Sequence, residues 1–250
     1  MTQHVLHHLH GTELWASYLP RIPQKLLMLA GVGLALMGVG IWGGQNNFGA
    51  WAWASGTLGG LLLAPALAVG LFVWWRWNFR TGTRRTMLDA VTWRGDEQVL
   101  DVGCGSGLLL NGAAKRLKTG QALGIDIWAP ASGGGNLDLL MRNARAEGVA
   151  DKIEFKEVDA RRMPFADGTF DVVMSSGALH HIAHGQAEFD QTLRELTRVL
   201  KPGGHLLLWD IQHMIEASAS RMKAVGVQCE TRAAPAFLGY EMGMLFGRKV

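Results

Sequence analysis

Three glycines alternate with other residues directly after a short apolar run that ends in an acid. Gly103, Gly105 and Gly107 follow Asp101, and an apolar, helix-like segment begins after them. This pattern is typical of a strand that feeds a tight loop and then a helix, where glycine lets a ligand approach the main chain closely. Nucleotide binders of several kinds share such a loop, so the pattern alone is weak evidence.

A second acid follows the next apolar run at the spacing that a ribose-binding site requires. Asp126 ends the run 122–126 and lies 19 residues after Gly107. An acidic side chain there can accept hydrogen bonds from both hydroxyls of a ribose. We therefore expect Asp126 to bind the sugar. Ile127 and Trp128 could pack against the base, although Trp128 could equally be a surface residue of the following loop.

Two histidines follow a later apolar run and could do acid–base chemistry. His180 and His181 come shortly after Ser175, which ends the run 171–175. Imidazole titrates near neutral pH and can remove a proton from a hydroxyl or from an acidic carbon. Either histidine is the candidate catalytic base, and lining of the pocket is the alternative.

Five motifs follow one another along the chain, at 101–107, Asp126, Asp159, 164–171 and 200–204. Their sequence and order resemble those of class I S-adenosylmethionine-dependent methyltransferases, and the small-molecule branch that includes quinone C-methyltransferases is closest in pattern. The resemblance covers roughly residues 84–250. It implies that the domain is an enzyme and that its cofactor is S-adenosylmethionine. An oxidoreductase of Rossmann type would lack the Leu-Lys-Pro-Gly-Gly turn.

The resemblance also implies how the cofactor is held. Asp101 would orient the glycine loop and face the positively charged methionine part of the cofactor. Asp159, with Ala160 beside it, matches the position at which the family contacts the adenine amino group. The expected cofactor-binding residues are Asp101, Gly103, Cys104, Gly105, Gly107, Asp126, Ile127, Asp159, Ala160 and Ser175.

Apolar runs alternate with helix-like segments through this region, which is typical of a parallel sheet covered on both faces. We expect a doubly wound, mostly parallel, seven-stranded α/β sheet of Rossmann-like type, closed by a hairpin. Ligands of such sheets bind at the carboxyl ends of the strands, where the motifs fall. The predicted strands lie near 97–102, 122–127, 152–157, 171–175, 204–210, 227–232 and 241–249, and the predicted helices near 107–118, 136–147, 186–199 and 213–224.

Two apolar stretches precede this domain. Residues 26–44 and 50–75 contain no charged side chain, and each can span a hydrocarbon core about 30 Å thick. Seven of the ten tryptophans lie before residue 78, as in the interfacial belt of membrane helices. We expect a transmembrane helical hairpin with spans at about 25–44 and 52–75. Buried helices of a soluble core and a cleaved signal peptide are the alternatives.

Basic residues set the expected orientation of this hairpin. Arg21 and Lys25 precede the first span, four arginines between 76 and 85 follow the second, and the connection 45–49 has none. The positive-inside rule then puts both ends and the catalytic domain in the cytoplasm. A bacterial inner membrane is the expected location. Attraction to anionic lipid headgroups explains the basic residues better than nucleic-acid binding.

Small residues recur along the second stretch at a spacing of four. Such positions share a helix face and let another helix approach closely. We favour packing of this face on the first span of the same chain, where Gly31, Ala35 and Gly38 are available, and a homodimer through the membrane is the alternative. The small residues are Ala52, Gly56, Gly60, Ala64 and Ala68.

The expected organisation has three parts: an interfacial segment at 1–22, two spans within 23–79 and the methyltransferase domain at 80–250. His4 and His8 could share a helix face, but the apolar residues around them favour an amphipathic segment at the membrane surface over a metal site. We expect no metal. The glycine-rich loop at 129–136 is a candidate lid.

These observations predict a membrane-anchored methyltransferase that moves a methyl group from S-adenosylmethionine to a lipophilic or membrane-associated small molecule. Two alternatives remain open. The acceptor could be a soluble small thiol or amine, with the hairpin serving only for location, or the chain could be a non-catalytic, cofactor-binding subunit of a membrane complex.

Overall fold

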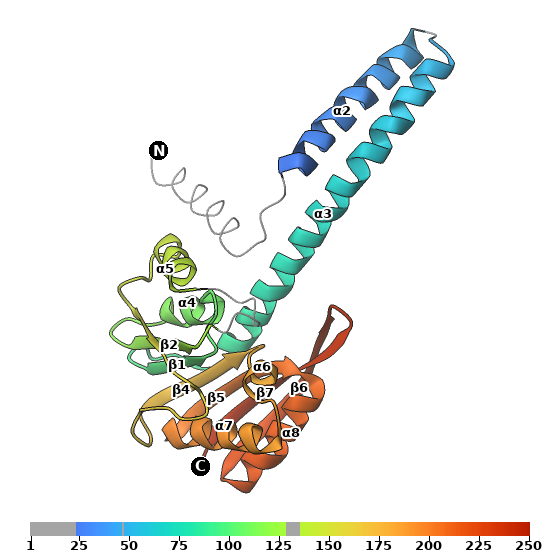
Figure 1. Ribbon diagram of the computed structural model, residues 1–250. Helices are drawn as coiled ribbons and strands as arrows, with labels where there is room; N and C mark the ends of the chain where they lie inside the picture. Colours follow the sequence, from blue (N-terminus) through green and yellow to red (C-terminus); the bar gives the residue numbers. More distant parts are fainter. Residues whose placement is uncertain (1–23, 47, 129–135) are drawn as a thin grey trace. The chain divides into compact units, whose positions relative to one another are not determined.

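The computed structural model describes residues 24–46, 48–128 and 136–250 (Figure 1). The chain forms two compact units: a helical hairpin that ends at Thr81, and an α/β domain that begins at Gly82. The roles expected for the N-terminal segment at 1–22, for its histidines and Arg21, and for the loop at 129–135 lie outside the described residues.

The helical hairpin consists of α2 (Gln24–Gln45) and the part of α3 (Ala50–Asp89) that ends at Thr81. Both helices are long and apolar enough, by length and composition, to cross a membrane. Their large apolar side chains face outward: Trp51 is 81% exposed and Leu61 is 72% exposed. An apolar surface of this kind marks a site of contact with a partner or with lipid.

Glycines bring the two helices of the hairpin together. A Cβ on Gly40 would lie 2.7 Å from the backbone nitrogen of Gly56, and one on Gly59 would lie 2.6 Å from the carbonyl oxygen of Gly33. Backbones can approach this closely only where side chains are absent. The two helices therefore pack on each other within the chain as expected, but the expected faces are wrong in part on both helices. On α3, Gly59 makes the close contact, whereas open space surrounds the Cβ position of Gly60 and Ala64 and Ala68 are exposed. Open space surrounds the Cβ positions of Gly31 and Gly38.

Seven strands form the central sheet of the domain: β1 (Gln98–Val102), β2 (Gln121–Asp126), β3 (Ile153–Glu157), β4 (Phe170–Ser176), β5 (Leu200–Ile211), β6 (Val227–Phe237) and β7 (Tyr240–Lys249). Their order is β3-β2-β1-β4-β5-β7-β6 (Figure 1). Neighbours from β3 to β5 are parallel, and β7 is antiparallel to β5 and β6. The expected Rossmann-like, mostly parallel seven-stranded sheet with its closing hairpin is confirmed.

Helices cover both faces of this sheet. They are α4 (Leu108–Ala114), α5 (Leu137–Ala146), α6 (Leu179–Ile182), α7 (Gln186–Val199) and α8 (Gln212–Ala224). Alternate strand residues point into two cores: Leu100 and Val173 lie in the core with α7 and α8, whereas Val99 and Val172 lie in the core with α4, α5 and the end of α3. All four are at most 1% exposed. Because side chains alternate along a strand, successive residues of β1 and β4 point to opposite faces of the sheet and into different cores.

Two helices differ from the sequence-based expectation. α3 continues past the expected end at 75, because Met87 and Leu88 in its last turns are buried in the domain core. Polar residues between the apolar stretch and these two side chains hide that continuation in the sequence. The four-residue α6 was not expected, since a single turn is too short to show periodicity.

Candidate functional site

The glycine loop joins β1 to α4 at the carboxyl edge of the sheet. Its glycines all have positive φ angles, of 70° at Gly103, 51° at Gly105 and 81° at Gly107. Glycine is favoured in that region because it has no Cβ. The backbone N–H groups of Gly103 and Cys104 donate hydrogen bonds to the carbonyl oxygen of Ile125, at 2.9 and 3.1 Å. These bonds fasten the loop to the end of β2.

Asp126 holds the same loop from the last position of β2. Its Oδ2 accepts a hydrogen bond from the Gly105 N–H at 2.9 Å, and its Oδ1 accepts one from the Trp128 N–H at 2.8 Å. A carboxylate oxygen can accept two hydrogen bonds, so both oxygens keep capacity for another donor. This half-buried carboxylate is suited to bind the two hydroxyls of a ribose.

Asp101 is a buried acid near the end of β1. It is 1% exposed, and its Oδ2 has no hydrogen-bond partner within the described residues. Burial, and to a smaller extent the nearby Asp126 carboxylate, raises the pKa of Asp101 to about 8. A cationic ligand would favour the ionised form of this carboxyl. The environment therefore fits the expected place beside the positively charged part of the cofactor.

Three of the expected cofactor-binding residues turn their side chains to the interior. Cys104 is 7% exposed in the core, and burial raises the pKa of its thiol. Ala160 is 5% exposed. Ser175 is 1% exposed, and its hydroxyl donates to the carbonyl oxygen of Val102 at 2.8 Å. These side chains contribute packing, so a ligand beside them would meet their backbone.

Trp128 and Ile127 form the wall of the site after β2. Trp128 stacks on Phe155 of β3, with ring centroids 4.0 Å apart and 18° between the planes. Its indole Nε1 donates to the Gly105 carbonyl oxygen at 3.4 Å. Trp128 is therefore packed rather than a free surface residue. Ile127 is 51% exposed and is the apolar side chain that remains open to a base.

The Asp159 carboxylate is engaged by an arginine. Arg161 donates from Nε to both of its oxygens at 3.0 Å and from Nη2 to Oδ2 at 2.7 Å. This pairing lowers the pKa of Asp159. Arg161 also donates to Glu188 at 2.7 Å. Asp159 is thus ionised and oriented, and an adenine amino group would share its oxygens with the guanidinium.

A histidine–aspartate pair that the sequence analysis missed lies at the same edge of the sheet. His180 Nδ1 is 2.7 Å from Oδ1 of Asp210, which is fully buried. Asp210 also accepts hydrogen bonds from the N–H groups of Leu179 and Ile211, at 2.9 and 2.8 Å. The hydrogen bond to Asp210 raises the pKa of His180. Because Nδ1 faces the carboxylate, Nε2 is the nitrogen left to accept a proton.

His181 has a different environment from its neighbour. It is exposed, and its ring centroid lies 3.9 Å from that of His180. Partial loss of water contact around the ring, and then the neighbouring His180, lowers the pKa of His181. Of the two candidate bases, His180 is therefore the one with an oriented ring. Asp210 could have been found from the sequence, because it follows an apolar run at 206–209 as Asp126 follows its own run.

Close packing brings the segment after β4 onto the glycine loop. A Cβ on Gly103 would lie 2.3 Å from the Cβ of Ala178, so glycine is required there by contact as well as by φ. Ala178 directly precedes α6, which carries His180. The glycine loop, the carboxylate of Asp126 and the His180–Asp210 pair thus lie along one edge of the sheet.

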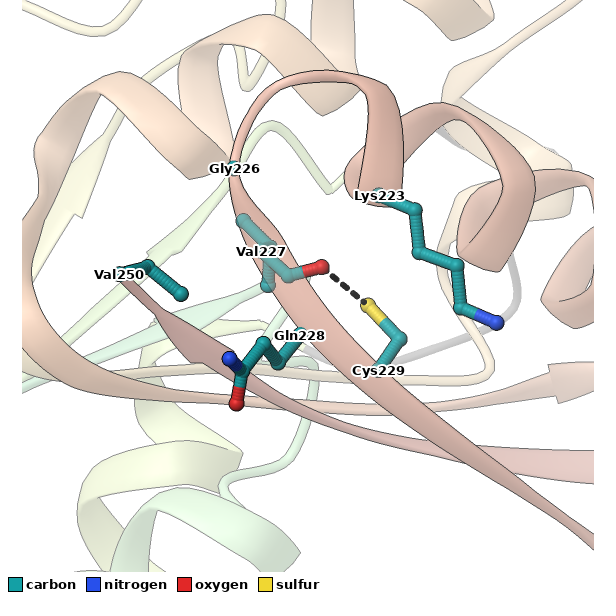
Figure 2. Close-up of a pocket in the computed structure, with 6 residues that line it drawn as sticks. All are labelled: Lys223, Gly226, Val227, Gln228, Cys229 and Val250. Atoms are coloured by element: carbon teal, nitrogen blue, oxygen red, sulfur yellow. Dashed lines mark hydrogen bonds between the residues drawn. The ribbon is translucent and has the colours of Figure 1, made fainter.

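Within the described residues, no group of three or more His, Cys, Asp or Glu side chains could hold a metal ion. A pocket of the domain lies at the opposite edge of the sheet, where β6 begins and β7 ends (Figure 2). The Cys229 thiol there donates to the carbonyl oxygen of Val227 at 3.5 Å. This pocket is therefore separate from the site at the carboxyl edge. Its lining consists of Lys223, Gly226, Val227, Gln228, Cys229 and Val250.

Residues 100–208 match the family described as methyltransferase domain. The chain is 33% identical over 135 residues to the demethylmenaquinone methyltransferase of Symbiobacterium thermophilum, a match that covers 54% of this chain and 48% of that protein. It is 36% identical over 132 residues to the ubiquinone/menaquinone biosynthesis C-methyltransferase UbiE of Pseudomonas putida, covering 51% of this chain and 47% of that one. The chain spans about half the length of the curated relatives it matches.

A solved structure shares the fold at low identity. The geranyl diphosphate C-methyltransferase of Streptomyces coelicolor, in complex with Mg²⁺, geranyl diphosphate and S-adenosyl-L-homocysteine, has a TM-score of 0.54 at 14% identity. The match covers 68% of this chain and 79% of that one. At this identity the likeness shows the fold alone.

Proposed function

We propose, from the class I S-adenosylmethionine-dependent methyltransferase domain that this chain carries, that the protein transfers a methyl group from S-adenosylmethionine to a lipophilic small molecule held at a membrane. The observation that carries the catalytic part is the His180–Asp210 pair, which shares a sheet edge with the glycine loop and Asp126. The hairpin of exposed apolar helices supports the membrane part.

The carboxylates at this edge suit the hydroxyl groups and the positive charge of S-adenosylmethionine. Asp126 would accept the two ribose hydroxyls, and the backbone of the glycine loop would lie against the amino-acid part of the cofactor. The open oxygen of the buried Asp101 would face the positive charges of that part. Ile127 would lie against the adenine, and Asp159 would accept from its amino group. When bound, the cofactor supplies a methyl carbon on a sulfonium, which is reactive without covalent help from the protein.

His180 would serve as the base for an acceptor that must lose a proton. Its Nδ1 keeps the hydrogen bond to Asp210, so Nε2 can take the proton from an acceptor hydroxyl or acidic carbon. The acceptor then forms a bond to the methyl carbon as the sulfur–carbon bond breaks, and that electron pair stays on sulfur. The Asp210 carboxylate stabilises the imidazolium that results. The segments around the site contribute alignment of the reactants and exclusion of water.

The proposed anchor comprises the two apolar helices within 23–79, with the methyltransferase domain at 80–250 on the cytoplasmic side. Lys25 lies in the first turn of α2, and the arginines at 76, 80, 84 and 85 follow the apolar part of α3. Orientation by these charges puts the short connection outside. The cofactor is a cytoplasmic metabolite, so this topology gives the domain access to it.

Cysteine labelling in intact cells tests the anchor and its orientation. Cys229 is first replaced by Ser, and the buried Cys104 is kept. We expect Asn46→Cys to react with an impermeant thiol reagent added outside, and the exposed Thr86→Cys to stay protected until the cells are opened. Labelling of Thr86→Cys alone in intact cells would contradict the proposed orientation.

Transfer of a radioactive methyl group tests the reaction. The full-length protein in lipid nanodiscs is incubated with methyl-labelled S-adenosylmethionine and a membrane lipid extract, and the organic phase is counted. We expect label in the organic phase, and its loss in the Asp126→Ala variant. Label only on added soluble thiols or amines would instead support the soluble acceptor, and label on neither would favour a non-catalytic cofactor-binding subunit.

A further inference from the structure

The tip of the β6–β7 hairpin is an exposed apolar segment of the catalytic domain. We use β-tip for residues 233–240, which are uncharged and lie between Arg232 and Glu241. Two residues, Leu238 and Gly239, connect the strands, with φ angles of 51° and 85°. Leu238 is 56% exposed and Tyr240 is 61% exposed.

Leu238 is an unusual residue for its position. A two-residue turn with positive φ at both positions favours Asn-Gly or Asp-Gly, because a branched apolar side chain is strained in the left-handed region. Here that position holds a leucine whose side chain gains little from burial. A strained backbone that carries an exposed apolar side chain calls for a function outside the domain's own packing.

The β-tip lies at the same edge of the sheet as the active site. Ile211, the last residue of β5, pairs with Met242 of β7, so the residues before Met242 project beyond the carboxyl end of β5 (Figure 1). Asp210 lies at that end of β5. Phe237 packs edge-on against Trp209, with ring centroids 6.4 Å apart. One aromatic ring thus fixes the base of the β-tip, and Leu238 and Tyr240 remain outward.

We propose that the β-tip enters the headgroup region of the bilayer and holds the active-site edge at the membrane surface, an inference that rests on the membrane anchoring proposed above. The chain's own apolar helices supply the reason to choose lipid as the partner. Leucine and tyrosine together suit an interface, where leucine reaches the acyl chains and the tyrosine hydroxyl stays among polar groups.

Charge around the β-tip indicates apolar rather than electrostatic binding. Arg232 donates to Glu230 at 2.7 Å, and its guanidinium lies 4.9 Å from the centre of the Phe246 ring. Glu241 borders the other side. The β-tip therefore presents no unpaired cation to anionic lipids, so its membrane contact depends on buried apolar area.

Spin-label quenching in the full-length protein tests this inference. In the Cys229→Ser background, Leu238→Cys is labelled with an environment-sensitive fluorophore, and the protein is placed in phosphatidylcholine nanodiscs with or without spin-labelled lipid. Val225→Cys is the matched control, because Val225 is 52% exposed but lies at the opposite edge of the sheet. Leu61→Cys reports on the helical hairpin. We expect quenching at 61 and 238, no quenching at 225, and little change when phosphatidylglycerol is added.

The outcomes separate the β-tip from the anchor. Quenching at 61 without quenching at 238 overturns the β-tip contact and leaves the anchor standing. Absence of quenching at both positions overturns the proposed anchor and this inference with it. A blue-shifted but unquenched label at 238 means that protein, such as a second copy, covers the β-tip, and this also overturns the proposal.

A second variant tests the same inference without a label. Leu238→Asn suits the left-handed backbone and should raise the melting temperature of the domain. It should also lower methyl transfer to an acceptor held in the bilayer several-fold, while transfer to the same acceptor dispersed in detergent stays unchanged. Equal rates in nanodiscs for the variant and the parent would overturn the proposal.

Discussion

The helical hairpin and the α/β domain place their apolar side chains in opposite ways. In the domain, apolar side chains of the central strands are inside: Leu100 and Ile125 are 0% exposed. In the hairpin, residues such as Leu61 and Trp51 face outward. Burying apolar area stabilises a fold in water by about 25 cal/mol per Å². The outward side chains of the hairpin do not contribute this stabilisation, because they are exposed. This contrast is the basis for proposing that lipid surrounds one region and water the other.

Glycine also serves the two regions differently. In the domain, Gly105 and Gly107 adopt positive φ angles that shape the loop between β1 and α4. In the hairpin, Gly33 and Gly40 are helical, and their missing side chains let two backbones touch. The contrast implies that the regions can be altered independently. Substitutions at the glycine loop should leave the packing of the two hairpin helices unchanged, and substitutions at the contact between those helices should leave cofactor binding unchanged.

The largest expected effect falls on the domain. His180→Ala should slow methyl transfer by about 10²–10⁴-fold, because it removes the proposed base. The affinity for S-adenosylmethionine and the retention of the protein in membranes should stay unchanged. Initial rates in nanodiscs, with calorimetry for the cofactor, measure the two quantities. His181→Ala is the matched control, and an equal loss in both variants would point to pocket lining.

The pH profile distinguishes a base from a packing residue. Since the hydrogen bond to Asp210 raises the pKa of His180, the rate should fall on the acid side with a midpoint above the ordinary histidine value of 6.5. In Asp210→Asn the imidazolium loses its carboxylate, so the midpoint should move to lower pH. A flat profile in both proteins would mean that the acceptor arrives already nucleophilic, as a thiolate or amine would.

A smaller effect is expected on cofactor affinity. Asp126→Ala should lower the affinity for S-adenosylmethionine at least tenfold, because hydrogen bonds to a charged group contribute about 1.5–3 kcal/mol each. Asp126 also accepts from Gly105, so part of the loss would come from a looser glycine loop. Glu154→Ala, an exposed acid on β3, is the control. Unchanged binding by calorimetry in Asp126→Ala would reject the ribose role.

Substitution in the hairpin should leave the domain untouched. Gly40→Leu places a side chain where a Cβ already meets the backbone of Gly56, and such overpacking costs about 1–3 kcal/mol. Gly38→Leu faces open space and is the control. Thermal unfolding in detergent, followed by circular dichroism, should show a less stable helical hairpin in the first variant only. A change in cofactor affinity in Gly40→Leu would break the independence of the two regions.

Most of the fold could be predicted from the sequence, because its signals are local. Apolar runs ending in Asp101 and Asp126 located β1 and β2, and the uncharged stretches located α2 and the start of α3. The end of α3 could not be found in this way. Its buried Met87 and Leu88 follow a polar stretch, and only the tertiary contact in the domain core explains why the helix continues.

Within the candidate site, the backbone geometry of the glycine loop could be predicted, because one residue type at a fixed spacing sets it. The pairing of His180 with Asp210 joins residues 30 positions apart, so it depends on which strands are neighbours in the sheet. The packing face of α2 was similarly hidden. The sequence does not distinguish Gly33 and Gly40 from Gly31 and Gly38. The rotation of α2 about its own axis decides which of these glycines face α3, and in the structure they are Gly33 and Gly40.

A further expected effect is a dependence of stability on pH that the domain supplies, since residues 26–75 contain no titratable side chain. The pKa of Asp101 is about 8 in the folded domain, against an ordinary value of 3.8. At a pH between these two values, Asp101 is therefore protonated in the folded domain and ionised in the unfolded chain. Its contribution to the free energy of unfolding is fully present below the lower value and is lost as the pH rises toward about 8. Asp101→Asn should flatten that decline, measured by denaturant unfolding at several pH values.

Binding of the cofactor should release the proton that Asp101 holds in the folded domain. A cationic ligand favours ionised Asp101, so binding at neutral pH should release a proton and become a few-fold tighter as the pH rises toward 8. Calorimetry in buffers of different ionisation enthalpy measures that proton. Asp101→Asn should bind with no such release, whereas the exposed Asp138→Asn should behave as the parent. If the parent releases no proton, Asp101 does not face the positive charge of the cofactor, and its burial serves the glycine loop alone.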